Sequence, residues 1–484
     1  MKRAVIALLL SCLAAGAAPQ ASAPSTGARP ASANAANAGN NANGARPAVS
    51  PPPQMPAETP PAATPTSPIA GEVETQDALP QPSSAAQDLY ESARGDLLQI
   101  RMLLKNGRTQ STVGSGFLVG TSNLALTNYH VVSQMALDPD VYTAEYIDTD
   151  GNTGPVELMA VDVLHDLAVV RVNRNGSGFF KVPEQAVKLR QGQPLYSLGN
   201  PLDLGFAISE GAYNGVLTRS FYDRLIFGGP INSGMSGGPS VTASGTVAGI
   251  NVARRRDGES VSFLVPVAYA QELLRKVAAQ AAPPEDFNPL IGQQLLAHQG
   301  GMVDKLLEEP LSLKGMGPYL VPVRESGQVR CWGRSSVKRG AAFNTDAMSC
   351  VMQSAVFVSD SQQTGNVAMT HQYIRSGSME PLRFAALASD LFKVDNLGIG
   401  DARLTKPFCT ERFVHTRTLP LRAVTCVRAY RNFEGLYNFT LLTASTDASQ
   451  ASLQSRLDVS GVSYENGLRV TRAFLGAFGR SGRR

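Results

Sequence analysis

Short apolar runs, separated by turns that contain glycine, asparagine or aspartate, fill the chain between residues 97 and 267. Runs of about four to eight residues rich in Val, Ile and Leu are typical of β-strands, and many of them in succession indicate a β-sandwich or barrel. A short helix starting at Ala86 and a closing helix at 267–279 flank these runs. The pattern therefore predicts an all-β domain over residues 86–280, with strands at 97–104, 116–119, 124–127, 167–172, 195–198, 215–218 and 246–252.

The pattern changes after an Ala-Ala-Pro-Pro-Glu-Asp stretch, which we interpret as part of a linker at 281–288. A long helical pattern at 289–307 comes first, and strand-like runs follow it. We expect an α+β domain over residues 289–484, with strands near 329–332, 355–359, 367–373, 423–430 and 437–445 and a last helix at 468–478. No motif in this domain predicts a reaction, so its attachment suggests binding of a substrate, a partner or a surface of the cell envelope.

Residues 1–17 have the pattern of an export signal. Met-Lys-Arg forms a basic start, and the apolar stretch after it is too short to cross a bilayer as a helix. From residue 18 to 85 the chain is mostly Ala, Pro, Asn, Ser, Thr and Gly, which cannot bury enough apolar surface to offset the entropy of ordering. We predict that this tract is a disordered linker.

Two ways of processing the signal stay open. Small residues at positions 15 and 17 allow cleavage after Ala17, which would release a soluble protein. The Leu9-Leu10-Ser11-Cys12 segment instead resembles the lipobox of bacterial lipoproteins, so that a signal of residues 1–11 would leave Cys12 as the acylated N-terminus. Both ways place the protein outside the cytoplasm, in the periplasm or secreted. The second anchors it to the outer membrane through Cys12.

The charge of the chain argues against some partners. The formal net charge is +4 and no run of Lys and Arg exceeds three residues, so nothing in the sequence requires a nucleic acid or an anionic membrane surface. The histidines other than His130 are scattered and show no ligand spacing, and we expect neither a metal site nor a cofactor. The oligomeric state is left open.

Four cysteines, Cys331, Cys350, Cys409 and Cys426, lie in the C-terminal third of the chain. An even number in an exported chain predicts disulfides, because an oxidising compartment lets them persist. Pairing in sequence order would close two short loops, each contributing roughly 3 kcal/mol through chain entropy. The other pairings stay open from the sequence alone.

A serine on a glycine-rich turn is the centre of the candidate chemistry. Ser236 lies in Ile-Asn-Ser-Gly-Met-Ser-Gly-Gly-Pro, and His130 lies upstream in a Val-rich segment that looks like a strand, with Asp166 between them. A serine hydroxyl needs an imidazole to take its proton, and the imidazole needs a carboxylate that fixes its tautomer. The turn would aim the amides of Gly234 and Ser236 at the oxyanion of a tetrahedral intermediate. These residues predict a Ser-His-Asp hydrolase.

The order His130, Asp166, Ser236 is the one found in chymotrypsin-like double β-barrels. From about residue 96 to 275 the chain resembles the trypsin-like serine peptidases of the bacterial Deg/HtrA type. Asp162 competes with Asp166 for the carboxylate role, and the Asp-Leu-Ala-Val-Val context favours Asp166. The matching segments, in the order of that family, are Gly114-Ser-Gly-Phe-Leu-Val, Thr127-Asn-Tyr-His-Val-Val, His165-Asp-Leu-Ala-Val-Val, Leu198-Gly-Asn-Pro, Gly234-Met-Ser-Gly-Gly-Pro, Val247-Ala-Gly-Ile-Asn and Phe263-Leu-Val-Pro.

The resemblance implies an all-β protease domain of two six-stranded barrels and an endopeptidase that cleaves peptide bonds of protein or peptide substrates through an acyl-enzyme. It also implies that Asn251, Val252 and Ala253 pair with the substrate as an added strand, and that Ile231 and Val252 lie near the specificity pocket. No PDZ module is recognisable after the protease region, so the resemblance does not extend to PDZ-regulated assemblies.

Two positions depart from the family pattern. Tyr129 precedes the histidine where a small alanine is usual, which predicts compensating space in a packed site. Met235 precedes the serine where Asn or Asp is usual, which predicts altered loop contacts with retained activity. Tyr129 also motivates an alternative function, that of a catalytically silent protein that binds peptides or partner proteins in the cell envelope.

Overall fold

The structure, a computed structural model, describes residues 83–481 except 186, 218, 255–260, 394–401 and 417. The export signal, Cys12 and nearly all of the 18–85 tract lie outside the described residues, so the predictions for them stay predictions. The described chain opens with helix α1 (Ser84–Ala93), where the Ser83 hydroxyl accepts a hydrogen bond from the Ala86 amide at 3.1 Å. A short 3₁₀ turn, η1 (Arg94–Asp96), leads from it into the first barrel.

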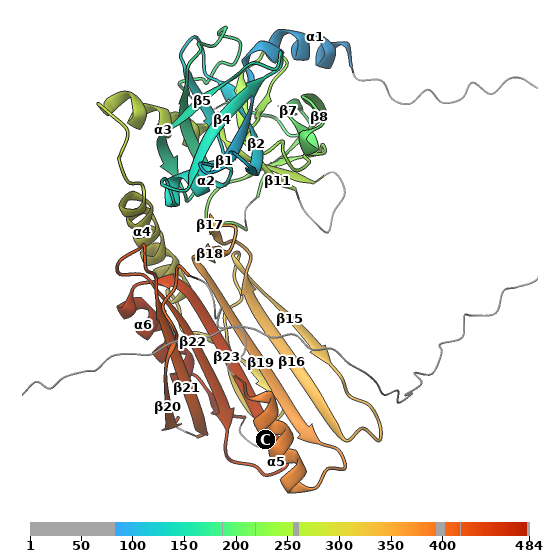
Figure 1. The fold of residues 1–484 in the computed structure, drawn as a ribbon. Coiled ribbons are helices and arrows are strands. Elements are labelled where there is room, and N and C mark those ends of the chain that lie inside the picture. The colour runs from blue at the N-terminus through green and yellow to red at the C-terminus, as the bar shows by residue number, and fades with distance from the viewer. Residues whose placement is uncertain are drawn as a thin grey trace, which may run out of the picture. The chain divides into compact units, whose positions relative to one another are not determined.

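Six antiparallel strands close into the first barrel (Figure 1). Inward-pointing side chains such as Leu98 and Ile100 are fully buried, and the alternate residue Leu97 is buried in a second cluster between the two barrels. Burial on both faces explains why the apolar runs of this region are almost continuous. In spatial order the strands are β1 (Leu97–Leu104), β2 (Gln110–Leu118), β3 (Leu124–Thr127), β6 (Leu167–Val172), β5 (Thr153–Asp162) and β4 (Tyr142–Asp148).

A second closed barrel follows along the chain. Leu198, Val247 and Ile250 pack in the cluster between the barrels, and helix α3 (Val267–Ala279) adds Leu273 to the same cluster. The expected fold of two six-stranded barrels is therefore confirmed. In spatial order the strands are β10 (Pro239–Val241), β11 (Val247–Arg254), β12 (Ser262–Pro266), β9 (Leu225–Phe227), β8 (Ala207–Val216) and β7 (Pro194–Gly199), with a 3₁₀ turn η2 (Pro201–Asp203) after β7.

One segment of the first barrel differs from its sequence-based interpretation. The Val-rich stretch that holds His130 is not a strand but helix α2 (Tyr129–Leu137). The signal for the helix is present in the sequence, because five of its six buried residues recur at intervals of three, one, three and one positions, as on one helix face. These five are Tyr129, Val132, Ser133, Ala136 and Leu137, and Val131 is the sixth.

The C-terminal domain is built on a seven-stranded antiparallel sheet (Figure 1). The sequence pattern located four of its seven strands, at 329–332, 367–373, 423–430 and 437–445, and missed the three at 343–352, 408–415 and 451–462. The fifth predicted strand, at 355–359, lies outside this sheet. In spatial order the sheet consists of β15 (Val329–Ser335), β16 (Phe343–Met352), β19 (Asn366–Ser376), β23 (Ala451–Val462), β22 (Tyr437–Ser445), β21 (Pro420–Ala429) and β20 (Phe408–His415). Smaller sheets are formed by β13 (Ser312–Met316), β14 (Tyr319–Val323) and β24 (Gly479–Arg480), and by the hairpin of β17 (Val356–Ser359) and β18 (Gln362–Thr364).

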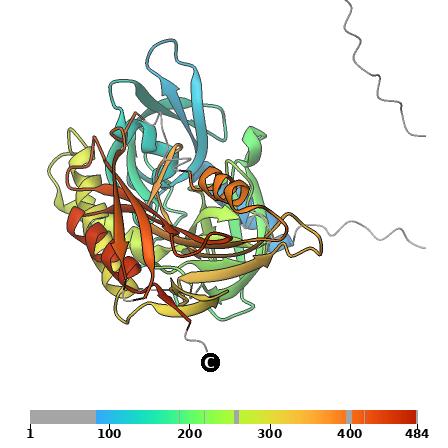
Figure 2. The ribbon, with the colours of Figure 1, turned by 90° about the horizontal axis from the view of Figure 1, so that it is seen from below.

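Helices cover the large sheet on both faces (Figure 2). Helices α4 (Asn288–Leu306) and α6 (Tyr464–Gly476) pack on one face, where Phe474 joins a buried cluster with Leu453. Helix α5 (Pro381–Leu391) lies against the other face, because the side chain of Gln454, the residue after Leu453, donates to the Ala388 carbonyl at 2.6 Å. Successive residues of a strand point to opposite faces, so the two contacts lie on opposite sides.

The four cysteines of this domain pair in sequence order. Cys331 in β15 is bonded to Cys350 in β16, and Cys409 in β20 is bonded to Cys426 in β21. Both bonds join residues that lie directly opposite each other on neighbouring strands. The expectation of an α+β domain that contains disulfides is thus confirmed.

A buried cluster connects this domain with the first barrel. It contains Tyr129 and Val132 of α2 together with Val358 of β17 and Phe433. All described residues belong to one compact unit. Among these residues, no helix combines the length and the apolar character that a membrane crossing requires.

Candidate active site

His130 and Asp166 form a two-point contact. The Nδ1 atom of His130 lies 2.8 Å from Oδ2 of Asp166, and the backbone amide of His130 donates to Oδ1 of the same carboxylate at 2.9 Å. The hydrogen bond from the backbone amide fixes the carboxylate relative to the first turn of α2. A carboxylate on Nδ1 favours the tautomer in which Nε2 is free to accept a proton.

Asp166 lies in the tight turn between β5 and β6, where its backbone adopts a φ of 61°, a left-handed conformation that is unusual for aspartate. The side-chain amide of Asn128 donates to the Asp166 carbonyl at 2.8 Å and holds this turn against the start of α2. Asn128 and Asp166 are both buried. The sequence motif included Asn128, but no sequence argument gave it this positioning role.

The turn that carries Ser236 depends on glycine. Gly234 has a φ of 92°, and a Cβ atom there would lie 2.3 Å from the carbonyl oxygen of Asn200. Ser115 of β2 holds the turn at two points, with its hydroxyl donating to the Gly234 carbonyl at 2.6 Å and its amide donating to the Ser236 carbonyl at 2.7 Å. A loop of the second barrel is thereby held against the first barrel.

The Ser236 turn approaches the start of α2. A Cβ atom on Gly114 would lie 2.4 Å from the side chain of Val131 and 3.2 Å from the carbonyl oxygen of Ser236. The absence of a side chain at Gly114 therefore lets Val131, the neighbour of His130, pack close to the serine turn. Three segments far apart in the sequence meet at this point.

The Ser236 hydroxyl itself has a different partner from the one expected. It donates to the carbonyl oxygen of Val252 at 3.3 Å, and in the described part of the chain it makes no hydrogen bond to His130. A change of side-chain rotamer alters the direction of a serine hydroxyl without moving the backbone. Such bonds often tighten only when substrate is bound.

The amides of the turn are available to a ligand. Across residues 83–481, outside the gaps given above, neither the Gly234 amide nor the Ser236 amide donates a hydrogen bond, whereas the Met235 and Gly237 amides donate to the carbonyls of Asn232 and Asn251. Unpaired amide donors beside a hydroxyl are the feature that an oxyanion hole requires.

The electrostatics of His130 favour proton uptake. Burial lowers the pKa of the imidazole, but the charge of Asp166 and the hydrogen bond with it, together with the charge of Asp360, outweigh burial and bring the pKa above its ordinary value of 6.5. Asp360 belongs to the β17–β18 hairpin of the C-terminal domain, a contribution that no sequence signal predicted.

A second histidine and carboxylate lie close by. Asp162, the last residue of β5, binds His165 through Oδ2 to Nδ1 at 2.6 Å and through Oδ1 to the backbone amide at 3.1 Å. The ring of Tyr269 stacks on His165 with a centroid distance of 3.6 Å, and the ring of Tyr222 meets it edge-on at 4.6 Å. Asp162 and Asp166, which compete for the carboxylate role in the sequence, therefore contact two different histidines.

The two departures from the family pattern are both buried. Tyr129 is fully buried and donates its hydroxyl to the Val358 carbonyl at 2.9 Å, so its ring fills the junction with the C-terminal domain. Burial raises its pKa far above the ordinary value, so the phenol stays neutral. Met235 is 2% exposed and packs with Ile231 in the core of the second barrel.

The residues predicted to bind substrate have different environments. Ile231 is 2% exposed. Asn251 is fully buried, and its backbone exchanges hydrogen bonds with Gly237 and Gly238, so it supports the serine turn. In the described residues, β10 pairs with β11 only up to Ile250, which leaves the backbone of Val252 and Ala253 without a strand on that side.

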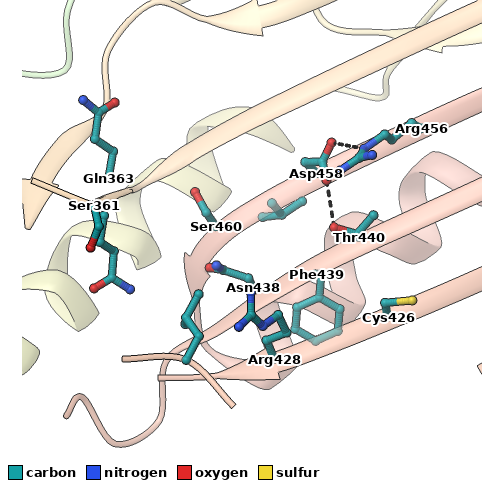
Figure 3. Close-up of a pocket in the computed structure, with 13 residues that line it drawn as sticks. Ser361, Gln363, Cys426, Arg428, Asn438, Phe439, Thr440, Arg456, Asp458 and Ser460 are labelled. Carbon is teal, nitrogen blue, oxygen red and sulfur yellow. Dashed lines mark hydrogen bonds and ion pairs between the residues drawn. The ribbon is translucent and has the colours of Figure 1, made fainter. Parts of the chain in front are cut away.

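A pocket of about 220 Å³ opens in the C-terminal domain, between the large sheet and the β17–β18 hairpin (Figure 3). Asp458 accepts from Thr440 at 2.7 Å and pairs with Nε of Arg456 at 2.6 Å, and Arg428 donates to the Thr405 carbonyl at 2.7 Å. The charged groups of the pocket therefore already have protein partners. The described residues contain no group of three or more His, Cys, Asp or Glu side chains placed to hold a metal ion.

Known proteins match the double-barrel part of the chain. Residues 114–250 match the family model of the trypsin-like peptidase domain. The candidate serine protease HhoA of Synechocystis is 33% identical over 193 residues, which are 38% of this chain and 46% of that protein. The mitochondrial serine protease HTRA2 of Drosophila virilis is 30% identical over 34% of this chain and 40% of its own length.

A candidate DegP-like periplasmic serine endoprotease of Brucella suis is 32% identical over 33% of this chain and 32% of its own length. The crystal structure of a serine endoprotease from Yersinia pestis covers 42% of this chain and 70% of its own, with 23% identity and a TM-score of 0.36. The matches span less than half the length of each of the three named sequence relatives. The double barrel of this chain is therefore a trypsin-like peptidase domain, similar to those of the HtrA and DegP serine proteases.

Proposed function

We propose that the protein is an exported serine endopeptidase that hydrolyses peptide bonds of protein substrates through His130, Asp166 and Ser236. The observation that carries the proposal is the two-point contact between His130 and Asp166. It lies beside a serine turn whose amides at Gly234 and Ser236 have no partner in the described chain. The relatives named above are serine proteases by name, which supports the same reaction class.

The first half of the reaction begins when the Ser236 hydroxyl leaves Val252 and turns to Nε2 of His130. As the serine oxygen bonds to the substrate carbonyl carbon, Nε2 takes the hydroxyl proton, and Asp166 stabilises the resulting imidazolium. The carbonyl oxygen becomes an oxyanion that accepts hydrogen bonds from the amides of Gly234 and Ser236. His130 then gives its proton to the leaving amine, the peptide C–N bond breaks, and an acyl-enzyme remains.

The second half repeats the steps with water. His130 takes a proton from the water as its oxygen bonds to the acyl carbon, and the same amides hold the second oxyanion. The bond to the serine oxygen breaks, and the proton on His130 returns to that oxygen. The product acid leaves and the enzyme is restored, with no cofactor needed.

The free edge of β11 is our candidate for the substrate-binding strand. A peptide that adds to Val252 and Ala253 by main-chain hydrogen bonds would run past the serine turn, because the Val252 carbonyl is the present partner of the Ser236 hydroxyl. Asn251 would hold the turn from beneath, and Ile231 would shape the base of the specificity pocket from the core of the barrel.

The proposal is tested by replacing Ser236 with alanine in the mature protein. Cleavage of an unfolded substrate such as casein should be lost, and a fluorophosphonate probe should label the wild type and not the variant. Ser233→Ala is the matched control, because Ser233 is an exposed serine three positions earlier in the same turn, and this variant should keep both signals. A wild type that is folded but neither labels nor cleaves would instead identify a silent peptide-binding protein.

Export is the second part of the proposal. It rests on the pattern of residues 1–17 and on the Brucella relative, which is named as periplasmic. The intact mass of the mature protein separates cleavage after Ala17 from acylation at Cys12, because the lipid adds mass to a chain that begins at residue 12. A mass that includes residues 1–11 would overturn export by either route.

A further inference from the structure

The β17–β18 hairpin of the C-terminal domain packs directly on the helix that carries His130 (Figure 1). Val356 and Val358 of β17 belong to the same buried cluster as Val132 of α2. A small cavity of about 150 Å³ between Ser133 and Ser361 marks the edge of the contact. The hairpin is therefore part of the surroundings of the peptidase site, although it lies more than two hundred residues away in the sequence.

Tyr129 fastens the two elements together. Its ring is fully buried, its hydroxyl donates to the Val358 carbonyl at 2.9 Å, and its ring meets that of Phe357 edge-on at 6.2 Å. Because Tyr129 precedes His130 in α2, this anchor fixes the hairpin next to the catalytic ring. An alanine at this position would offer neither contact.

Two side chains of the hairpin contact the helix that carries His130. The ring of Phe357 meets the imidazole of His130 edge-on with a centroid distance of 5.8 Å. Asp360, in the turn of the hairpin, accepts from the side-chain amide of Gln134 in α2 at 3.2 Å. Phe357 thus covers one side of the ring, and Asp360 brings a negative charge to the same helix.

We propose that the β17–β18 hairpin is a built-in part of the peptidase site, in which Phe357 and Asp360 are positioning residues that tune His130. The inference rests on the proposed function and goes beyond it, because it makes the catalytic base depend on the C-terminal domain. Loss of contact with the hairpin would leave the two barrels intact and would change the pKa of His130.

The charged groups around His130 come from several elements. Asp166 from the β5–β6 turn and Asp360 from the hairpin both raise the pKa of His130 against the effect of burial. Arg403 is paired with Asp138 after the end of α2, and the Arg224 guanidinium binds the carbonyl of His165, next to Asp166. Tyr129 stays neutral because burial raises its pKa.

The two hairpin residues should act in opposite directions. Asp360→Asn keeps an acceptor for Gln134 but removes the charge, so the pKa of His130 should fall and activity should persist to lower pH. Phe357→Ala admits water to the His130 ring and relieves the burial that disfavours the charged imidazole, so the pKa of His130 should rise. On acidification, activity should then begin to fall at a higher pH than in the wild type.

The experiment is a ¹⁵N-histidine NMR titration of His130 in the Ser236→Ala background of the full mature protein, which needs no activity. Asp140→Asn is the matched control, because Asp140 is an exposed carboxylate just beyond α2, whereas the carboxylates that raise the pKa of His130 are Asp166 and Asp360. Its titration should equal that of the parent protein. The five histidines of the chain are assigned by single substitutions.

A lower pKa of His130 in Asp360→Asn and a higher one in Phe357→Ala support the proposal. In the corresponding variants that keep Ser236, the acidic limb of the plot of kcat/KM against pH should move in the same two directions. An unmoved titration in Asp360→Asn, or shifts of the same sign in both variants, overturns it. If Phe357→Ala does not fold, Asp360→Asn, a change at an exposed site, decides alone. A silent wild type with the predicted titrations would refute the peptidase function and leave only the effect of the hairpin on His130.

Discussion

The first barrel contains two histidine–carboxylate pairs with nearly the same local geometry and very different surroundings. In each pair one carboxylate oxygen binds Nδ1 and the other binds the backbone amide of the histidine, Asp166 for His130 and Asp162 for His165. His130 lies next to the serine turn and has a half-buried ring, whereas Tyr269 stacks on the ring of His165. A carboxylate thus orients a histidine in both places, and in the described chain His130 is the one of the two that lies beside the turn of Ser236.

The comparison teaches that the pair alone does not identify a catalytic base. The Nε2 edge of the imidazole, opposite the carboxylate, must face a group that can give up a proton. In the pair of Asp162 and His165 the ring of Tyr269 stacks on the imidazole, the ring of Tyr222 meets it edge-on, and Arg224 binds the carbonyl of His165. We therefore interpret this second pair as structural.

The largest effect should come from removing one histidine at a time. His130→Ala should lower kcat/KM on the order of 10⁶-fold, because the serine then has no base. His165→Ala should change kcat/KM less than about tenfold and should lower the melting temperature, because it removes a stacked ring from a packed site. Steady-state kinetics on a peptide substrate measures kcat/KM, and thermal unfolding measures the melting temperature. Equal losses of activity would break the distinction between the pairs.

The carboxylates provide the next test. Asp166→Asn should lower kcat by about 10⁴-fold, because an amide on Nδ1 favours the wrong tautomer of the imidazole. Asp162→Asn makes the same change in the other pair and should leave kcat nearly unchanged. The fluorophosphonate labelling rate reports the same difference without a substrate. A strong loss in Asp162→Asn would show that the second pair also serves the reaction.

A third histidine, in the C-terminal domain, sharpens the comparison because, among the described residues, its ring nitrogens contact a hydroxyl and a carbonyl and no carboxylate. His371 is fully buried between the Ser455 hydroxyl and the Pro322 carbonyl, each 2.8 Å from a ring nitrogen. Burial lowers its pKa from 6.5 to about 4, despite the hydrogen bond with Pro322. The folded state therefore holds the ring neutral, whereas the unfolded chain takes up a proton below about pH 6.5.

The stability that depends on neutral His371 is present above pH 6.5 and is lost as the pH falls toward 4, by on the order of 3 kcal/mol. Urea unfolding at pH 7.5 and pH 4.5 should show this loss in the wild type. His371→Gln should be less stable at pH 7.5 and less sensitive to acid. Exposed His415→Gln should unfold like the wild type at both values. An acid sensitivity unchanged in His371→Gln would contradict the assignment.

The smallest effect among the variants of the His130 site should come from Asn128, which donates to the Asp166 carbonyl. Asn128→Ala removes one hydrogen bond and leaves a buried carbonyl unpaired, so kcat/KM should fall by about tenfold through displacement of the carboxylate. KM should change little. A loss as large as that in Asp166→Asn would mean that Asn128 acts in the reaction itself and not through Asp166.

Several features could be predicted from the sequence because they depend on neighbouring residues. The strands at 97–104, 124–127 and 167–172 have the predicted bounds, since apolar runs between turns identify them. Helix α2 was missed because two valines next to His130 dominated the local pattern, although the helical spacing of its buried residues was present. Strand β20, which is almost entirely exposed, carries no such pattern, so no apolar signal could locate it.

By itself the sequence determined the order of the candidate triad, the double barrel and the glycines of the serine turn, because each depends on short motifs whose chemistry is local. The tertiary structure alone decided which carboxylate binds which histidine, where the Ser236 hydroxyl points and why a tyrosine can stand at position 129. These outcomes depend on packing between segments far apart in the chain. The contact of the β17–β18 hairpin with His130 also depends on such packing, since spacing along the sequence does not encode which surfaces meet.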